Sequence, residues 1–269
     1  MIRRFALFGK PVAHSMSPLM MTEAFAQMGI NGHYQAVEVS RAQDIVDSIR
    51  SRGIEGASVT IPHKVAVMDL LDELSESAHT IGAVNTVIEN NGKLRGDNTD
   101  WLGVERALSE VMTIPGRRFA VLGAGGAARA VIYCIKKNGG TPVLLNRTEA
   151  RGEEVAREMN CEFVSSARIH TIDADCLVNT TPLGMWPNVA QTPVAHSLLS
   201  RFTWVMDTIY NPLETKFMAD AVKAGCTAIS GLAMFVHQGA QQIRVWTGKE
   251  PPVEAMMRVV RDHLTHERN

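Results

Sequence analysis

The sequence has little that would place the protein in a membrane, on a nucleic acid or in an oxidising compartment. Its only cysteines are scattered along the chain without CxxC spacing: Cys134, Cys161, Cys176 and Cys226. This spacing indicates neither a metal site nor a disulfide framework, and it predicts reduced, mostly buried thiols of a cytoplasmic protein. The formal net charge is −1, so bulk charge attracts the chain neither to nucleic acid nor to a membrane surface.

Long apolar runs are also missing. The opening segment "MIRRFALFGKPVAHS" has a basic pair and a short apolar run, but Gly9, Lys10 and Pro11 interrupt that run too early for a signal peptide. No run is long enough to span a bilayer. With 269 residues, 45% of them hydrophobic, the chain reads as a globular protein of one large or two small domains. Nothing in the sequence decides between a monomer and a homodimer.

Strand-like and helix-like segments alternate in the first hundred residues. Ser17 is a plausible N-cap for a helix that has Pro18 at its first position, and Asn91-Gly92 marks a hairpin turn. The predicted strands are 5–9, 34–39 and 56–62, with two extended segments within 83–100, and the predicted helices are 17–29 and 41–53.

The second part of the chain continues this alternation after a connecting helix at 101–111. Short apolar strands are predicted at 175–182, 204–210 and 226–230, and helices at 149–159, 214–225, 233–246 and 253–264. Such alternation predicts an α/β fold with a mainly parallel sheet. We expect two domains, 1–101 and 102–237, with the closing helices of 238–269 packing back onto the first.

The segment "FAVLGAGGAARAVIYCIKKNGGTPVLLNRTEAR", residues 119–151, reads as strand, glycine turn, helix and strand. Its glycines match G-x-G-x-x-A, in which the first glycine permits the tight turn and the second lets a pyrophosphate approach the backbone. The following helix N-terminus offers N–H groups to phosphates. The bare pattern also occurs in other α/β proteins, but the flanking elements favour a dinucleotide site. The predicted contacts are Gly123, Ala124, Gly125, Gly126 and Ala127.

The second strand of this unit ends without the acidic residue that usually holds the ribose of NAD. Asn146 stands there instead, followed by Arg147 and Thr148, with Arg151 one helical turn later. A guanidinium pairs with a phosphate and stacks on adenine, so the segment predicts a preference for NADP. The alternative is a pair of solvated arginines on a surface helix.

Polar residues concentrate in four loops of the first hundred residues: "GKPVAHSMSP", "SVTIPHK", "GAVNT" and "GDNTD". Their serines, threonines and asparagines suit a polyhydroxylated ligand that needs many neutral hydrogen-bond partners. Each loop taken alone could equally be a capped turn.

These motifs, together with "NTTPLGM", "IYNP" and "HQGAQQ", resemble the shikimate/quinate dehydrogenase family over nearly the whole chain. The resemblance implies NADP-dependent oxidoreduction of a ring hydroxyl. The family reduces 3-dehydroshikimate to shikimate in chorismate and aromatic amino acid biosynthesis. It also implies a substrate domain followed by a Rossmann-type NADP domain.

Site roles implied by the resemblance follow from matching positions. Lys64 matches the catalytic lysine and Asp100 its carboxylate partner. The matched substrate positions are Ser15, Ser17, Thr60, Asn85, Asp100, Tyr210 and Gln238. The matched cofactor positions are Glu76, Gly123, Ala124, Gly125, Gly126, Ala127, Asn146, Arg147, Thr148, Arg151, Thr208 and Gly231.

Other readings of these residues stay open. Lys64 could be a surface lysine after a strand, and Asp100 could cap a helix while also serving catalysis. Two neighbouring histidines, His14 and His63, are interpreted as structural rather than as acid–base groups. The chain departs from the family pattern at Met21, Thr22, Ser58, Ser230 and Ala233.

These departures leave the ring substrate open. Quinate or another shikimate-like ring alcohol is an alternative to shikimate. A non-catalytic NADP-binding sensor and a methylenetetrahydrofolate dehydrogenase are the other competing functions. The intact lysine–aspartate pair argues against a sensor, and the serines of "HSMSP" and the arginine of "NRT" argue against a folate enzyme.

Overall fold

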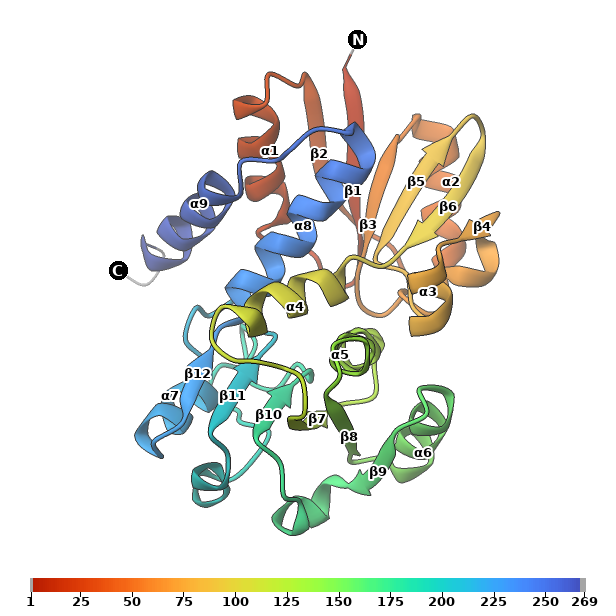
Figure 1. Ribbon diagram of the computed structural model, residues 1–269. Helices are drawn as coiled ribbons and strands as arrows, with labels where there is room; N and C mark the ends of the chain where they lie inside the picture. Colours follow the sequence, from red (N-terminus) through yellow and green to blue (C-terminus); the bar gives the residue numbers. More distant parts are fainter. Residues whose placement is uncertain (1, 267–269) are drawn as a thin grey trace. The chain divides into compact units, whose positions relative to one another are not determined.

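The computed structural model describes residues 2–266, and the chain divides into two compact units. The first unit runs through Thr99 and resumes at Val236, and the second unit comprises Asp100–Phe235. Each unit is built on its own sheet with helices on both faces (Figure 1). The predicted α/β class, a substrate-type domain with a Rossmann-type domain, is confirmed. None of the helices in the described part of the chain is both long and apolar enough to cross a bilayer.

The first unit carries a mixed sheet, whose described strands are ordered β2-β1-β3-β5-β6-β4. The first three in that order are parallel, whereas β5 runs antiparallel to β3 and to β6. The strands are β1 (Arg3–Gly9), β2 (Gly32–Glu38), β3 (Gly56–Val59), β4 (Glu73–Leu74), β5 (Thr86–Asn90) and β6 (Lys93–Asp97). The helices are α1 (Ser17–Gln27), α2 (Ala42–Arg52), η1 (Met68–Leu70), α3 (Glu76–Ile81), the later part of α8 (Gly231–Thr247) and α9 (Val253–His266).

Alternating side chains of β1 supply both faces of this sheet. Ala6 and Phe8 join a buried cluster with Ile45 and Ile49 of α2. Phe5 points to the other face, where its ring lies 4.8 Å from that of Phe25 and 5.3 Å from that of Trp246.

The closing helices belong to the first unit from Val236 onward. The Trp246 indole donates to the Val87 carbonyl oxygen at 3.1 Å, and α9 packs against α1 (Figure 1). This packing brings the segment around Gln238 onto the sheet formed by the first hundred residues.

Two local predictions for the first unit have opposite outcomes. The hairpin is confirmed, because β5 and β6 pair around Asn91 and Gly92, which have φ of 52° and 84°, as a two-residue turn requires. Ser17 as an N-cap is wrong. The cap is Met16, whose carbonyl oxygen accepts the first helical hydrogen bond from Met20 N at 3.0 Å.

The second unit carries a parallel sheet, whose described strands are ordered β12-β11-β10-β7-β8-β9. Its strands are β7 (Arg118–Leu122), β8 (Thr141–Asn146), β9 (Glu162–Ser165), β10 (Cys176–Asn179), β11 (Trp204–Asp207) and β12 (Thr227–Ile229). Its helices are α4 (Asp100–Ser109), α5 (Gly126–Lys137), α6 (Glu149–Glu158), η2 (Ser166–Thr171), η3 (His196–Arg201), α7 (Lys216–Lys223) and the start of α8.

Both faces of this sheet are covered. Phe119 and Val121 pack with α4 and α5 residues on one face, and Ala120 and Leu122 pack with Phe217 of α7 on the other. Later strands extend the sheet in opposite directions from the β7–β10 pair, so this pair is the topological switch point. In doubly wound sheets, ligands bind beyond the carboxyl ends of the strands at that point.

Candidate functional site

In the first unit, the polar loops converge at one edge of the sheet. The parallel strands β1 and β3 end there at Gly9 and Val59. The antiparallel strand β5 begins there at Thr86, and β6 ends there at Asp97. The topology therefore brings all four polar motifs of the first hundred residues to this carboxyl edge of the first sheet.

Asn85 lies at the centre of this edge and is almost fully buried. Its Oδ1 accepts from Thr99 N at 2.8 Å and from Thr86 Oγ1 at 2.7 Å. Its Nδ2 donates to Thr99 Oγ1 at 3.0 Å and to Gln238 Oε1 at 3.2 Å. Gln238 of α8 therefore reaches the same edge as "GAVNT" and "GDNTD".

The serines of "HSMSP" contact each other directly. Ser15 Oγ donates to Ser17 Oγ at 3.2 Å and accepts from Ser17 N at the same distance. The hydroxyl pair is thereby fixed at the start of α1. A Cβ added to Gly239 would lie 2.5 Å from Met20 Cε, so α8 passes close to α1 at Gly239.

The loop after β3 is anchored by its backbone. Thr60 N donates to Phe8 O at 2.8 Å, and Lys64 O accepts from Val84 N at 2.7 Å, next to Asn85 in the chain. Lys64 itself is half-buried. The neighbouring His63 ring is buried, and its Nε2 lies 2.9 Å from Val39 O, as expected for a structural histidine.

Glu76 is exposed in the first turn of α3, a helix that the sequence reading did not predict. Ser75 caps this helix by accepting from Ala78 N at 3.1 Å. Asp97 Oδ1 accepts from Ser75 Oγ at 2.6 Å and from Ser77 Oγ at 2.9 Å. These bonds tie Glu76 to the end of β6.

Asp100 is the first residue of α4 and belongs to the second unit, but it directly follows Thr99, which is held by Asn85. Its carboxyl group is buried, with the residue 4% exposed. A buried carboxyl at a helix start suits both of the roles expected for Asp100, which are capping of the helix N-terminus and catalysis.

The glycine turn of the second unit has two different reasons for its glycines. Gly123 has φ +108°, and an added Cβ would lie 2.7 Å from Thr180 Oγ1, so the fold itself requires glycine. Gly125 has φ −98°, and an added Cβ would meet no heavy atom of the described residues within 4 Å. The open space beside Gly125 fits the approach of a pyrophosphate.

The helix that follows is equally suited to phosphate. Gly125 is the N-cap of α5 and provides no side-chain cap, and the first turn contains no acidic residue. The 12-residue helix therefore presents its positive end without a neutralising charge. The residues present fit a dinucleotide at this turn.

At the end of β8, Asn146 Nδ2 donates to Thr148 O at 2.8 Å and shapes the turn. Arg147 is exposed, and it makes no hydrogen bond or ion pair with another residue in the described range 2–266. Arg151 Nη1 lies 2.6 Å from Glu154 Oε2. Of the two arginines, Arg147 is therefore the one that needs no rearrangement to meet a phosphate.

A buried carboxyl group links the loops after β10 and β11. Asp207 accepts from Thr215 Oγ1 at 2.7 Å, Ile209 N at 3.1 Å and Asn179 Nδ2 at 3.1 Å. Asn179 Oδ1 in turn accepts from Thr181 N at 3.0 Å. Burial raises the pKa of Asp207 to about 6, although the three donors oppose that rise.

Thr208 and Gly231 meet beside this network. Thr208 Oγ1 donates to Asn179 O at 3.0 Å. A Cβ on Gly231 would lie 2.4 Å from Ile209 O and 2.6 Å from Thr208 O, so the start of α8 needs glycine to approach this backbone. Tyr210 stacks on Phe235 with ring centroids 3.9 Å apart.

Four of the five departures from the family pattern have the following environments. Met21 is fully buried in the first unit, whereas Thr22 is exposed. Ser230 Oγ accepts from Leu232 N at 3.2 Å at the start of α8. Ser58 is buried and bonded to Tyr34 and Gln242.

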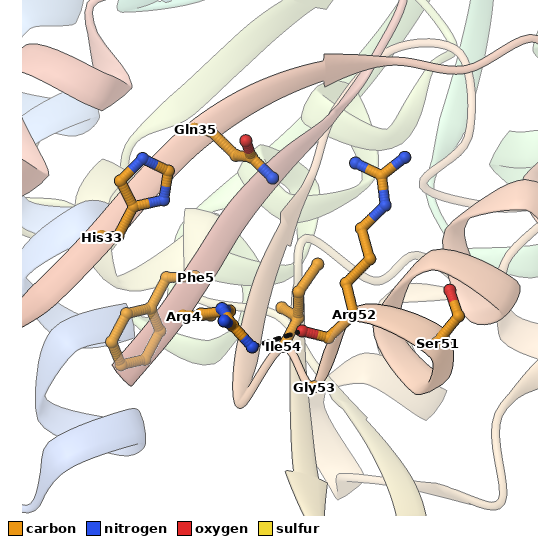
Figure 2. A pocket seen from close by; sticks show the side chains of 8 residues that line it. All are labelled: Arg4, Phe5, His33, Gln35, Ser51, Arg52, Gly53 and Ile54. Carbon is orange, nitrogen blue, oxygen red and sulfur yellow. Dashed lines mark hydrogen bonds between the residues drawn. The ribbon is translucent and has the colours of Figure 1, made fainter. Parts of the chain in front are cut away.

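One surface hollow does not involve any predicted site residue. Figure 2 shows this depression of about 530 Å³ beside β2 and the end of α2, lined by Arg4, Phe5, His33, Gln35, Ser51, Arg52, Gly53 and Ile54. Arg4 Nη1 donates to Arg52 O there at 3.3 Å. Its arginines are exposed surface groups, so we place the site at the sheet edges instead.

Metal ligands and reactive thiols are not prominent. Within residues 2–266, no group of three or more His, Cys, Asp or Glu side chains is arranged to hold a metal ion. Burial raises the pKa of the Cys134 thiol to about 12, which keeps it protonated and unreactive.

The sequence reading missed the residues that hold the site groups in place. A buried hydrogen bond joins Gln242 to Asn85. Near Thr208, the buried hydrogen bonds are made by Asn179 and Asp207. Two of these three residues had a local signal: Asn179 opens the motif "NTTPLGM", and Gln242 lies four residues after Gln238 and so on the same face of α8.

A doubly wound sheet with a glycine turn, together with a polar site on a second sheet, defines the two-domain, Rossmann-type oxidoreductases. Comparisons with known proteins specify the family. Residues 7–87 match the shikimate dehydrogenase substrate binding domain, and residues 231–261 match the shikimate 5'-dehydrogenase C-terminal domain. The chain is 40% identical to the shikimate dehydrogenase (NADP(+)) of Shouchella clausii, over 98% of this chain and 100% of the relative. The protein belongs to the shikimate dehydrogenase family.

Solved structures of related enzymes share the fold of this chain. Shikimate 5-dehydrogenase from Thermus thermophilus, in complex with NADP(H) and shikimate, superposes with a TM-score of 0.88 at 34% identity, over 97% of this chain and 99% of that one. The ligand-free 5-ketofructose reductase of a Gluconobacter species gives 0.83 at 31% identity, over 98% and 99%. The same fold thus occurs in a reductase with a differently named substrate.

Proposed function

We propose that this protein is an NADP-dependent shikimate dehydrogenase that reversibly reduces 3-dehydroshikimate to shikimate in aromatic amino acid biosynthesis. The observation that carries the proposal is full-length identity of 40% to a shikimate dehydrogenase (NADP(+)). It is joined by the gathering of Ser15, Ser17, Thr60, Lys64, Asn85 and Gln238 in the first unit, around one sheet edge.

The two parts of the chain have separate tasks. Residues 1–101 with 238–269 bind the ring substrate, and residues 102–237 bind NADP. The neutral donors and acceptors at the carboxyl edge of the first sheet suit a ring with several hydroxyl groups. Asp100 and Tyr210 are the remaining substrate positions in this proposal.

Lys64 is the proton-transfer group. Oxidation of a ring hydroxyl removes a hydride from carbon and a proton from oxygen, and Lys64 Nζ takes that proton. In the biosynthetic direction Lys64 returns it to the ketone oxygen. Asp100 orients Lys64 and the hydroxyl. When bound, the oxidised cofactor NADP⁺ would accept the hydride, and the reduced cofactor NADPH would supply it in the biosynthetic direction.

Cofactor selection follows from residues at the end of β8. Asn146 has no charge to repel a 2′-phosphate, and Arg147 is exposed to pair with it. Gly123 through Ala127 receive the pyrophosphate, supported by the open space beside Gly125. Thr148, Arg151, Thr208, Gly231 and Glu76 complete the cofactor contacts.

We further infer a cytoplasmic enzyme, monomeric or homodimeric, whose partners are small molecules rather than nucleic acid. The support is the net charge of −1 and the four free cysteines, three of them buried.

The test is a set of initial rates with shikimate and with quinate, each with NADP and with NAD at equal concentrations. A fast rate with shikimate and NADP, and little with NAD, is expected. Faster turnover of quinate would overturn the substrate assignment, and equal use of NAD would overturn the role of Arg147. If the protein bound both ligands without turning over any ring alcohol, it would be a sensor rather than an enzyme.

A further inference from the structure

A chain of buried hydrogen bonds runs through the first unit from Tyr34 to Asn85. Tyr34 OH donates to Ser58 Oγ at 2.7 Å, and Ser58 Oγ donates to Gln242 Oε1 at 2.7 Å. Gln242 Nε2 donates to Asn85 O and to Thr86 Oγ1, each at 3.0 Å. All five residues are at most 6% exposed, so water does not substitute for these bonds.

Two backbone groups fix which atoms donate and which accept in these hydrogen bonds. Thr99 N can only donate, so the Asn85 atom facing it must be the amide oxygen. Asn85 O can only accept, so the Gln242 atom facing it must be the amide nitrogen. The remaining oxygen of Gln242 then needs a donor, which is Ser58, and Ser58 in turn accepts from Tyr34.

The orientation of the Asn85 amide also determines the orientation of the Gln238 amide. With Oδ1 of Asn85 receiving Thr99 N and Thr86 Oγ1, its Nδ2 faces Gln238 Oε1 at 3.2 Å. The oxygen of Gln238 is thereby committed as an acceptor toward Asn85. Its amide nitrogen is directed to the other side.

We propose that Tyr34, Ser58 and Gln242 are positioning residues that set the amide of Gln238 so that it meets a substrate hydroxyl as a hydrogen-bond donor. The proposal rests on the proposed function, because Gln238 is there assigned to the substrate. The three residues act through Thr86, whose hydroxyl accepts from Gln242 Nε2 and donates to Asn85 Oδ1, and they do not touch the substrate. Ser58 is one of the positions at which the chain departs from the family pattern, and its hydroxyl is the link between Tyr34 and Gln242.

The experiment is a double-mutant cycle on steady-state kinetics with Ser58→Ala, Gln238→Ala and the double variant. Removing the Ser58 hydroxyl leaves the buried Gln242 Oε1 without its donor, which loosens Gln242 and the Thr86 hydroxyl that it holds against Asn85 Oδ1. Loss of one well-placed bond to the substrate corresponds to about tenfold in KM. We expect Ser58→Ala to raise KM for shikimate by about that factor. KM for NADP should stay within about twofold, because all proposed cofactor contacts except Glu76 lie in the other unit.

The decisive measurement is the effect of Ser58→Ala on the shikimate KM, compared between the protein with Gln238 and the protein with alanine at that position. If Ser58 acts through Gln238, its effect on the shikimate KM should largely vanish when Gln238 is already alanine. Equal effects in both backgrounds would show a general structural role and overturn the proposal. An unchanged KM in Ser58→Ala would overturn it as well.

Controls keep the outcomes separable. Ser51→Ala removes an exposed serine of the same unit whose hydroxyl bonds a backbone carbonyl, and it should leave all constants unchanged. Tyr34→Phe deletes one oxygen from a ring of the same shape and tests the chain again if Ser58→Ala fails to fold. It should also raise the shikimate KM with the NADP KM unaffected, and no change would count against the chain. The wild-type rate with shikimate separately decides the proposed function.

Discussion

Replacing Gly125 by alanine separates a glycine kept for a ligand from one kept for the fold. Gly125 has φ −98°, a value open to any residue, and an added methyl group meets no described atom within 4 Å. The substitution should therefore leave stability within about 1 kcal/mol, with a gain where alanine restricts the unfolded chain. The methyl group would instead occupy space that a pyrophosphate needs.

The expected loss falls on cofactor binding. Pushing the pyrophosphate away from the first N–H groups of α5 would weaken charge-assisted hydrogen bonds, which contribute roughly 1.5–3 kcal/mol each. That corresponds to about ten- to a hundredfold weaker binding of NADPH. Titration calorimetry with NADPH measures the affinity, and urea unfolding measures the stability of the same sample.

Gly123→Ala is the matched control. Its φ of +108° and the 2.7 Å approach of a Cβ to Thr180 Oγ1 should destabilise the fold by roughly 1–3 kcal/mol. The Thr180 hydroxyl cannot move away easily, because it donates to Leu122 O at 2.6 Å. Unchanged NADPH affinity in Gly125→Ala, or a stability loss as large as that of Gly123→Ala, would refute the assignment of the open space to the cofactor.

Three further predictions follow from single residues. Arg147→Ala should raise KM for NADP by about tenfold or more and leave KM for NAD nearly unchanged, because only the 2′-phosphate contact is lost; parallel saturation curves with the two cofactors check this. The pKa of Asp207 is raised from 3.8 to about 6 in the folded protein. Between pH 4 and 6 the folded state therefore keeps a proton on this carboxyl that the unfolded chain has lost. The contribution of Asp207 to the free energy of unfolding should fall across this range as the pH rises, by up to roughly 3 kcal/mol. Asp207→Asn should flatten that part of the pH profile in urea unfolding, and an unchanged slope would contradict the burial argument. Gly152→Ala should lower stability by about 1–3 kcal/mol despite alanine's helix propensity, because the new Cβ would lie 2.1 Å from the Phe163 ring; thermal unfolding measures it, and a higher Tm would show that the ring moves aside freely.

The sequence predicted those elements whose signal is local. Asn91-Gly92 specified its hairpin, and the glycine turn marked both the strand before it and the helix after it. The alternation of short strands and helices was enough for the α/β class. Capping was less predictable, since Ser17 had the right residue type but Met16 takes the cap position.

Residues that hold the site together were not predictable because their contacts are long-range. Ser58 and Gln242 are bonded across 184 positions, and Asn179 and Asp207 across 28. Strand order decides which of these residues meet, and no short motif encodes it. The short helix α3 was also missed, although Ser75 is a regular N-cap, because its 6 residues are too few for a helical period.

The role of Lys64 carries the mechanistic account, and one variant tests it most directly. Lys64→Ala should lower kcat for shikimate oxidation by about 10²–10⁴, the usual contribution of a positioned acid–base group, while NADPH affinity stays as in the wild type. Lys93→Ala, which removes an exposed lysine of β6, should have no effect on either quantity. Turnover within about tenfold of wild type in Lys64→Ala would contradict the proton-transfer role and return the site to an open question.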